Sequence, residues 1–244
     1  MIIDILTIFP NMLDAYIQES IIKRALIDEK IEINVINIRN FSKLKHHQVD
    51  DTVYGGGAGM LLMFPPFYDA VNSLRREDTH IILTTPKGKT LTQKRVEELS
   101  KKEHIIILCG HYEGIDSRIE EFVDEEVSIG DYVLTGGELA ALVLVDSIAR
   151  LQEGVINEES HLDDSFSKGI LEYPQYTKPQ SYMGRDVPEV LLSGHHENIA
   201  KFRKYEATKE TYLKRPDLLK NLSKEDEKIL KQVKEDLKWK KYFY

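Results

Sequence analysis

The feature that most constrains the fold is a series of short, isoleucine-rich apolar runs separated by segments with helical spacing. Continuous runs occupy 2–9, 80–85 and 105–109, and an alternating run occupies 31–38. Short apolar runs are typical of buried strands, and strands that alternate with helices favour a parallel sheet. The sequence therefore predicts an α/β fold. The expected helices cover 12–27, 65–74, 92–100 and 138–151, with Thr92 as the N-cap of the third and an apolar face on the last, formed by Leu139, Leu142, Val143, Val145 and Ile148. The segment 39–66 is expected to be irregular, and the acidic segment 120–126 is expected to be a solvated helix end. A further short strand is expected from Val127, Cys109 is expected to be buried, and Ser193 is a candidate cap for the helix that follows it.

Three of the predicted strands end in residues that break regular structure, namely Thr85-Pro86, Gly110 and Gly130. In open α/β sheets ligands bind beyond the carboxyl ends of the strands, so we expect these three ends to converge. A glycine pair, Gly136-Gly137, follows them and precedes an apolar helix. No lysine stands at this helix start, so the stretch suits a flat, neutral, adenine-sized group better than a polyphosphate. The alternative is two tight turns beside a core helix.

The segment 39–66 carries two further candidate sites. Four glycines lie within 55–59, which would allow another chain or a ligand to approach closely, but no Gly-Lys-Ser/Thr follows as a phosphate loop requires. His46 and His47 could bind a metal with Asp50 or Asp51. Because metal sites need well-spaced ligands and supporting contacts, we expect an exposed polar loop and no metal site.

Composition excludes several classes of protein. Cys109 is the single cysteine among 244 residues, so disulfide frameworks and cysteine-based zinc sites are excluded. No apolar run approaches about 18 residues and no leader is recognisable, so we expect a cytoplasmic protein without a membrane partner. Residues 1–167 carry 16 Lys and Arg against 29 Asp and Glu, whereas 168–244 carry 17 against 12. This asymmetry indicates a polyanion partner for the basic part or, alternatively, a solvated helical tail.

Five motifs follow one another along the chain: Tyr54-Gly-Gly-Gly-Ala-Gly-Met, Cys109-Gly-His-Tyr-Glu-Gly-Ile-Asp, Ser128-Ile-Gly-Asp-Tyr-Val-Leu-Thr-Gly-Gly-Glu, Asp164-Ser-Phe and Val190-Leu-Leu-Ser-Gly-His-His. In this order they closely resemble the bacterial tRNA (guanine-N1)-methyltransferase family, TrmD. The resemblance runs from Ile8 to Leu219. Ala58 stands where the family often has proline, and residues 239–244 cannot be aligned.

The resemblance implies a SPOUT fold, with a deep trefoil knot in a parallel-sheet N-terminal domain and a small, mostly helical C-terminal domain. It implies a knotted domain at 1–156 that binds S-adenosylmethionine, a flexible linker at 157–172 that carries the catalytic Asp, and a tRNA-binding domain at 173–244. The activity implied is methylation of N1 of the guanosine 3′ to the tRNA anticodon (position 37). A homodimer with shared active sites is also implied. A dependence on Mg²⁺ is implied as well, although no cluster of ligands for it is recognisable in the sequence.

Site residues are transferred from the family by position. Asp164 resembles the base that removes the N1 proton, Arg150 the partner of the guanine O6, and Glu113 the acidic residue that helps to fix the base or the donor. The implied donor-binding residues are Leu83, Thr84, Thr85, Pro86, Gly110, Tyr112, Glu113, Ile129, Gly130, Asp131, Tyr132, Val133, Leu134, Gly136 and Gly137. Candidate tRNA contacts are His195, Lys201, Arg203 and Arg215, which lie among aromatic residues.

Two other classes of protein compete with this interpretation. A doubly wound enzyme that uses NAD or ATP would need Gly-x-Gly-x-x-Gly after the first strand, where Phe9-Pro10-Asn11 stands instead. A non-catalytic RNA-binding module would not explain an acidic first part with three ligand-ready strand ends.

Overall fold

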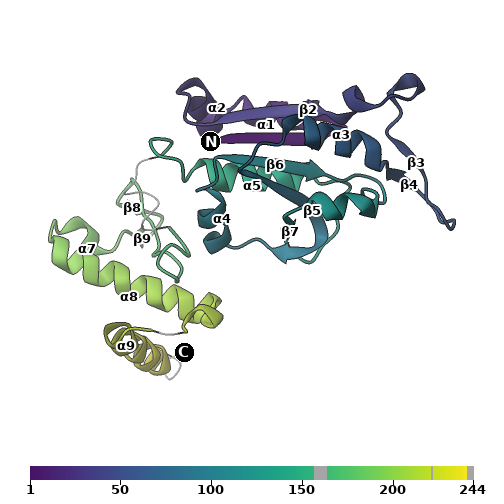
Figure 1. The fold of residues 1–244 in the computed structure, drawn as a ribbon. Coiled ribbons are helices and arrows are strands. Elements are labelled where there is room, and N and C mark those ends of the chain that lie inside the picture. The colour runs from purple at the N-terminus through teal and green to yellow at the C-terminus, as the bar shows by residue number, and fades with distance from the viewer. Residues whose placement is uncertain (157–163, 221, 241–244) are drawn as a thin grey trace. The chain divides into compact units, whose positions relative to one another are not determined.

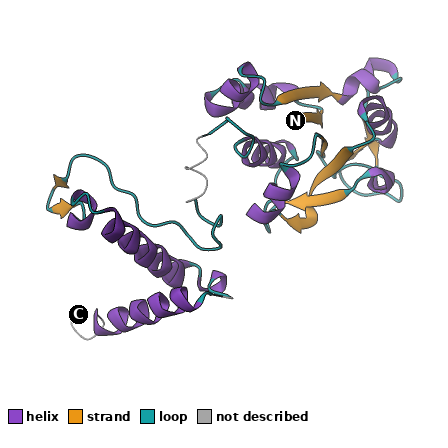
Figure 2. Ribbon diagram, turned by 60° about the vertical axis from the view of Figure 1, so that its left-hand side comes forward, coloured by secondary structure: helices purple, strands orange, loops and turns teal. Residues whose placement is uncertain are grey.

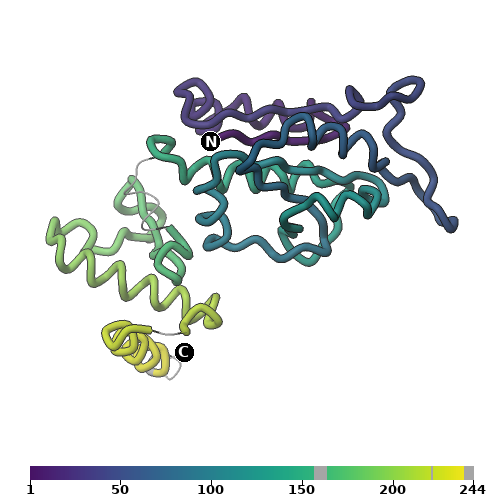
Figure 3. Tube along the Cα trace, in the orientation of Figure 1, coloured from purple at the N-terminus to yellow at the C-terminus, as the bar shows by residue number. Residues whose placement is uncertain are grey.

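A computed structural model describes residues 1–156, 164–220 and 222–240. The chain divides into two compact units, at 1–158 and 159–244, and each is considered by itself. The expected linker at 157–172 falls partly outside the described residues, because its first seven positions are not described. Figure 1 labels the elements along the chain, Figure 2 separates helices from strands, and Figure 3 gives the path of the backbone.

A five-stranded sheet forms the centre of the N-terminal unit. Its strands are β1 (Ile2–Thr7), β2 (Glu32–Asn37), β5 (Thr79–Thr90), β6 (His104–Cys109) and β7 (Glu125–Ser128). Their order is β2-β1-β6-β5-β7, and every pair is parallel. The predicted parallel α/β fold is confirmed. All carboxyl ends of a parallel sheet lie at one edge, so the loops that follow β5, β6 and β7 can meet there.

Helices cover both faces of the sheet (Figure 1). The alternating residues of β6 show why: Ile105 and Ile107 pack against one set of helices, whereas Ile106 and Leu108 pack against the other. One layer consists of α1 (Pro10–Ile17), α2 (Ser20–Ile27), α4 (Gln93–Leu99) and α5 (Glu138–Ala149). The other contains α3 (Phe64–Leu74) and 3₁₀ turns at Ile38–Phe41 and Ser117–Phe122. Thr92 caps α4 as predicted, by accepting the Arg95 N–H.

The single helix predicted at 12–27 is two helices. Glu19 is extended and Ser20 has a φ of +53°, so the chain changes direction between α1 and α2. This change lets Ile22 and Ala25 reach the core from the second helix. Helical spacing of apolar residues does not reveal such a break.

The segment 39–66 is more regular than predicted. A hairpin of β3 (Asp50–Thr52) and β4 (Met60–Leu62) holds the glycine loop at its tip, and a 3₁₀ turn spans Lys45–His47. Three main-chain hydrogen bonds join the hairpin to the loop after β6: Glu113 N–H donates to Met60 O (3.0 Å), Leu62 N–H donates to Gly114 O (3.0 Å) and Asp116 N–H donates to Leu62 O (2.9 Å). The hairpin is therefore fixed beside one of the converging strand ends.

Three further details differ from expectation. β5 does not end at Pro86 but continues to Thr90. Its pairing with β7 is interrupted after Thr84 and resumes at Lys89 in a shifted register. The acidic segment at 120–126 is not a helix end, because Glu125 begins β7. On α5, Leu139 and Val143 were expected in the apolar face but are exposed, and the alanines and Leu144 fill the core in their place.

The C-terminal unit is mostly helical, which confirms that part of the predicted fold. Its elements are β8 (Ser181–Tyr182), β9 (Arg185–Asp186), α7 (Glu189–Leu192), α8 (His196–Lys214), a 3₁₀ turn (Pro216–Leu218) and α9 (Lys224–Lys240). Ser193 was considered as a cap for the long helix; its hydroxyl accepts the His195 N–H one residue before α8 begins. Across the described residues of both units, no helix has the length and apolar character needed to cross a membrane.

Candidate active site

A cleft of about 680 Å³ lies at the carboxyl ends of β5, β6 and β7. Its walls come from four segments: 83–87 in β5, 110–115 after β6, 126–137 in β7 and the loop after it, and parts of the β3–β4 hairpin. The predicted convergence of Thr85-Pro86, Gly110 and Gly130 is therefore confirmed. The glycine loop that the sequence left without a role supplies the fourth wall.

Nearly every residue in the implied donor-binding set lines this cleft. The lining members are Leu83, Thr84, Thr85, Pro86, Gly110, Tyr112, Glu113, Ile129, Gly130, Tyr132, Val133, Leu134, Gly136 and Gly137. Asp131 is the exception: it is exposed and does not line the cleft. The lining residues that the set missed include His111 and Thr135.

The segment 129–137 offers main-chain atoms to the cleft. Gly130 has a φ of +146°, and Tyr132 N–H turns back to donate to Gly130 O (2.9 Å). The N–H groups of Val133 and Leu134 have no main-chain acceptor among the described residues. They are therefore available to a ligand, as expected for a planar group held by backbone hydrogen bonds.

Gly137 lies where the loop after β7 crosses the ends of β5 and β6. Its N–H donates to Gly110 O (2.8 Å), and a Cβ at this position would lie 3.0 Å from Cys109 Cα and 3.1 Å from Gly110 N. Only glycine allows so close an approach of backbone to backbone. The chain then enters α5.

The buried side chain of Glu138 lies beside the glycine pair. The Glu138 side chain is 1% exposed, and its Oε1 accepts a hydrogen bond from Thr7 Oγ1 (2.7 Å). Its Oε2 lies 3.8 Å from His111 Nδ1, and neither of these atoms has a hydrogen-bond partner among the described residues. Gly136 fits between them, because a methyl group there would overlap both. This arrangement ties β1, the loop after β6 and the start of α5 together at the cleft.

Glu113 lines the cleft beside the hairpin. Its carboxylate lies against Gly59, where a Cβ would come within 2.5 Å of Oε1. The hairpin tip and the loop after β6 therefore fix the position of this acidic side chain together. The family-implied role of Glu113 stays a prediction.

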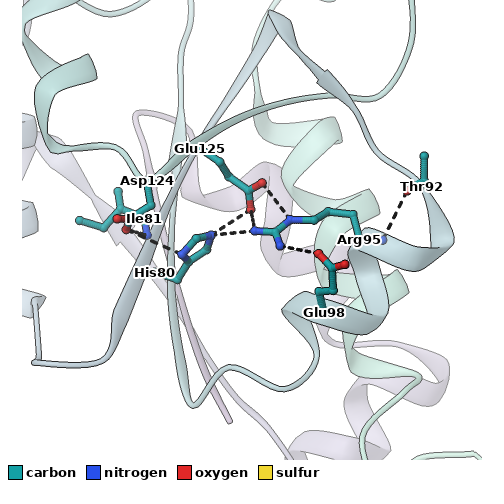
Figure 4. Close-up of polar contacts among 7 residues, drawn as sticks. All are labelled: His80, Ile81, Thr92, Arg95, Glu98, Asp124 and Glu125. Atoms are coloured by element: carbon teal, nitrogen blue, oxygen red, sulfur yellow. Dashed lines mark hydrogen bonds and ion pairs between the residues drawn. The ribbon is translucent and has the colours of Figure 1, made fainter.

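The strand that leads into the cleft is held by a charged cluster (Figure 4). Arg95 donates two hydrogen bonds to Glu125, at 2.9 Å from Nε and 2.7 Å from Nη2, and His80 Nε2 lies 2.9 Å from Glu125 Oε1. Burial alone would raise the pKa of Glu125, but the hydrogen bonds from His80 and Arg95 outweigh it and lower the pKa to about 2. The cluster joins α4 to β7 and so fixes the start of the segment 129–137.

Cys109 is fully buried behind the cleft, as predicted. Burial, assisted by the negative charge of Glu138, raises the pKa of its thiol well above the usual value. A thiol that is kept protonated is a poor nucleophile, so Cys109 contributes packing and no covalent chemistry.

The two other candidate catalytic residues are each considered within their own unit. Arg150 caps the end of α5, where its N–H donates to Asp146 O (3.1 Å). Asp164 belongs to the C-terminal unit and lines a second cavity of about 620 Å³ there. Their assignments stay predictions.

The candidate tRNA contacts are all exposed on the C-terminal unit. His195 precedes α8, and Lys201 pairs with Glu197 at 2.6 Å. The guanidinium of Arg203 lies 4.8 Å from the centre of the Tyr173 ring, and that of Arg215 pairs with Asp217 at 2.7 Å. Lys201 and Arg215 are thus each paired with a neighbouring carboxylate.

No cluster of three or more His, Cys, Asp or Glu side chains placed to hold a metal ion occurs among the residues that the structure describes. In particular, His46 and His47 form no such group with Asp50 or Asp51. A role for Mg²⁺ stays a prediction.

The sequence matches the family model for tRNA (guanine-1)-methyltransferase TrmD over residues 1–221. The chain belongs to the TrmD family. Curated relatives named tRNA (guanine-N(1)-)-methyltransferase include one from Acholeplasma laidlawii, 51% identical across 97% of this chain and 99% of the relative. Another, from Aster yellows witches'-broom phytoplasma, is 52% identical over the same shares. A third, from Caldanaerobacter subterraneus, is 51% identical across 95% of this chain and 98% of the relative.

Membership of the TrmD family confirms the resemblance drawn from the five motifs, and with it a methyltransferase that acts on tRNA. The parallel sheet and the helical C-terminal unit agree with the SPOUT fold of that family.

Proposed function

We propose that this TrmD-family protein transfers the methyl group of S-adenosylmethionine to N1 of the guanosine on the 3′ side of the tRNA anticodon, position 37. The observation that carries the proposal is the cleft at the three strand ends, lined by the family motifs. Because tRNA is a polyanion, it suits the basic C-terminal part of the sequence as a partner. With tRNA as the substrate, the reaction is expected to take place in the cytoplasm.

The cleft fits the proposed donor in size and chemistry. A volume of about 680 Å³ suits a nucleoside-sized ligand. Its walls offer main-chain N–H groups at Val133 and Leu134 and an aromatic ring at Tyr132, without a glycine-rich lysine site for phosphates. When bound, the sulfonium donor supplies an activated methyl group, so the protein has mainly to orient the reactants and remove a proton.

Asp164 is proposed as the group that removes this proton. Guanine N1 is protonated at neutral pH and becomes a good nucleophile only when a base takes its proton. An unperturbed aspartate, with a pKa near 3.9, is a weak base at pH 7. Exclusion of water around Asp164 when tRNA binds would raise that pKa and strengthen the base.

Arg150 and Glu113 are proposed to stabilise and orient the guanine. As N1 loses its proton, negative charge develops on O6, and the Arg150 guanidinium can stabilise that charge. Glu113, held at the cleft wall by Gly59, can accept hydrogen bonds from the base or the donor. No step is assigned to Mg²⁺.

A homodimer with shared active sites is proposed as well, and an exposed apolar patch on the N-terminal unit supports it. α1 and α5 pack against each other, and Tyr16 O–H donates to Asp146 between them. Large apolar side chains on both helices face solvent: Met12, Tyr16, Leu139 and Val143. A two-fold contact through this patch would remove these side chains from solvent.

Replacement of the base tests the mechanism directly. Asp164→Asn should slow single-turnover methylation by about 10²-fold or more, because N1 then keeps its proton. Asp163→Asn makes the same charge change one position away and should react at the wild-type rate. A rate for Asp164→Asn within about tenfold of wild type, equal to about 1.4 kcal/mol of barrier, would show that Asp164 is not the base.

A further inference from the structure

The segment that carries Asp164 is folded against α8 over its described part. Within it, Ser167 N–H donates to Asp164 O (3.2 Å), Phe166 N–H donates to Ile170 O (2.8 Å) and Gly169 N–H donates to Phe166 O (2.9 Å). Phe166 and Gly169 have φ values of +74° and +77°, so the chain reverses twice within a few residues. The turn at 164–170 is therefore an ordered structure of the C-terminal unit.

One stripe of α8 holds this segment. Arg203, Ala207 and Thr211 are spaced four residues apart and so lie along one side of the helix, and Arg215 caps its C-terminal end. Thr211 is fully buried; its hydroxyl donates to Ala207 O (2.7 Å) and accepts the Leu171 N–H (3.0 Å). Arg203 lies over the ring of Tyr173, which follows the segment.

Arg215 makes the contact nearest to Asp164 in sequence. Its guanidinium carbon lies 5.8 Å from the centre of the Phe166 ring. Asp217 holds the guanidinium in place through two hydrogen bonds, at 2.9 Å from Nε and 2.7 Å from Nη2. A cation fixed in this way can hold an aromatic ring, but its charge is already balanced, which makes it a poor phosphate ligand.

We propose that Arg215 is a positioning residue: by holding Phe166 against the end of α8, it makes the C-terminal unit carry Asp164 as a fixed part of itself. The sequence instead predicts Arg215 as a tRNA contact and Asp164 as part of a flexible linker. Binding of tRNA to the C-terminal unit would then bring the base to the guanine together with the RNA. This inference rests on the proposed role of Asp164.

The test uses the full-length protein, S-adenosylmethionine and an unmodified tRNA transcript, both saturating, under single-turnover conditions. Arg215→Ala should slow methylation about tenfold while the Kd values for tRNA and donor change by less than about twofold. Arg215→Lys, which keeps a cation above the ring, should recover part of the rate. Lys214→Ala removes a neighbouring charge that pairs with Glu210 and should leave the rate unchanged.

A double-mutant cycle with Phe166→Leu separates positioning from other roles. If Arg215 acts through Phe166, Phe166→Leu should slow the reaction similarly, and the double variant should be no slower than either single variant by more than about twofold. If the rate reductions of the two single variants multiply in the double variant, the proposal is overturned. So would an Arg215→Ala variant that binds tRNA more weakly but reacts at the normal rate at saturation, since that is the behaviour of a phosphate contact.

The outcomes also separate this inference from the proposed function. Should Arg215→Ala fail to fold, as judged by thermal unfolding, Arg215→Lys and Phe166→Leu carry the test. A wild-type protein that forms no N1-methylguanosine contradicts the proposed function. A wild-type protein that does form it, with a slow Asp164→Asn variant and a fast Phe166→Leu variant, contradicts only the positioning role.

Discussion

Gly136 and Gly137 are required for two different physical reasons. Gly137 allows the loop after β7 to cross the backbone at Cys109 and Gly110, whereas Gly136 leaves room for the side chains of Glu138 and His111. The sequence indicates that these glycines are special, because a glycine pair before a helix marks a sharp bend or a close approach. It does not indicate what they approach, since His111 and Thr7 come close only in the folded chain.

Gly136→Ala should destabilise the protein by about 1–3 kcal/mol, because the new methyl group would overlap Glu138 Oε2 and His111 Nδ1. The glutamate cannot swing away easily, as it is buried and bonded to Thr7. Chemical unfolding measures the change. Gly110→Ala is the matched control, because its Cβ would meet neighbours only at 3.6 Å or beyond. Equal stability of the Gly136→Ala variant and wild type would contradict this account of the buried pair.

At the scale of elements, apolar spacing located most strands and helices but not their interruptions. Three features depend on contacts distant in sequence: the break at Ser20, the register shift of β5 against β7 before Lys89, and the start of β7 at Glu125. Glu125 illustrates the difficulty. In the sequence it belongs to an acidic run that suggests solvent exposure, yet in the fold it pairs with Arg95 and His80 from two other elements.

The lowered pKa of Glu125 makes a prediction about pH. A carboxyl group whose pKa is about 2 when folded and near 4.5 otherwise stabilises the fold while it is ionised in both states. Its contribution, about 1–2 kcal/mol after allowance for solvent screening, should be complete above pH 4.5 and decline as pH falls towards 2. The free energy of unfolding of wild type and Glu125→Gln, compared between pH 7 and pH 3, measures it. A difference between the two proteins that grows on acidification has the wrong sign for this account.

At the scale of the whole molecule, the sequence predicts an acidic α/β part and a basic helical part, but not which apolar side chains face solvent. Leu139 and Val143 illustrate the limit. Their helical spacing predicts that they pack in the core, yet Leu139 and Val143 are 51% and 44% exposed. Sequence cannot distinguish an apolar face that packs inside a subunit from one that packs between two subunits, because both bury the same kinds of side chain.

The exposed patch on α1 and α5 predicts the behaviour of a charged variant. Val143→Glu should convert the proposed homodimer into a monomer, since a charge cannot be buried unpaired in such a contact, and methylation should be lost with it. Analytical ultracentrifugation measures the assembly. Leu213→Glu, on an exposed leucine of α8, should leave the dimer intact. A Val143→Glu variant that stays dimeric would place the interface on another surface.

The central claim is that the cleft holds a methyl donor and that its methyl group goes to one nitrogen of one tRNA nucleoside. Its most direct test is to incubate the wild-type protein with methyl-labelled S-adenosylmethionine and an unmodified tRNA transcript, digest the RNA and identify the labelled nucleoside. The account predicts label in N1-methylguanosine at position 37, and none when that guanosine is replaced by another nucleoside. Label in any other nucleoside or at any other position, or RNA without label, would contradict it.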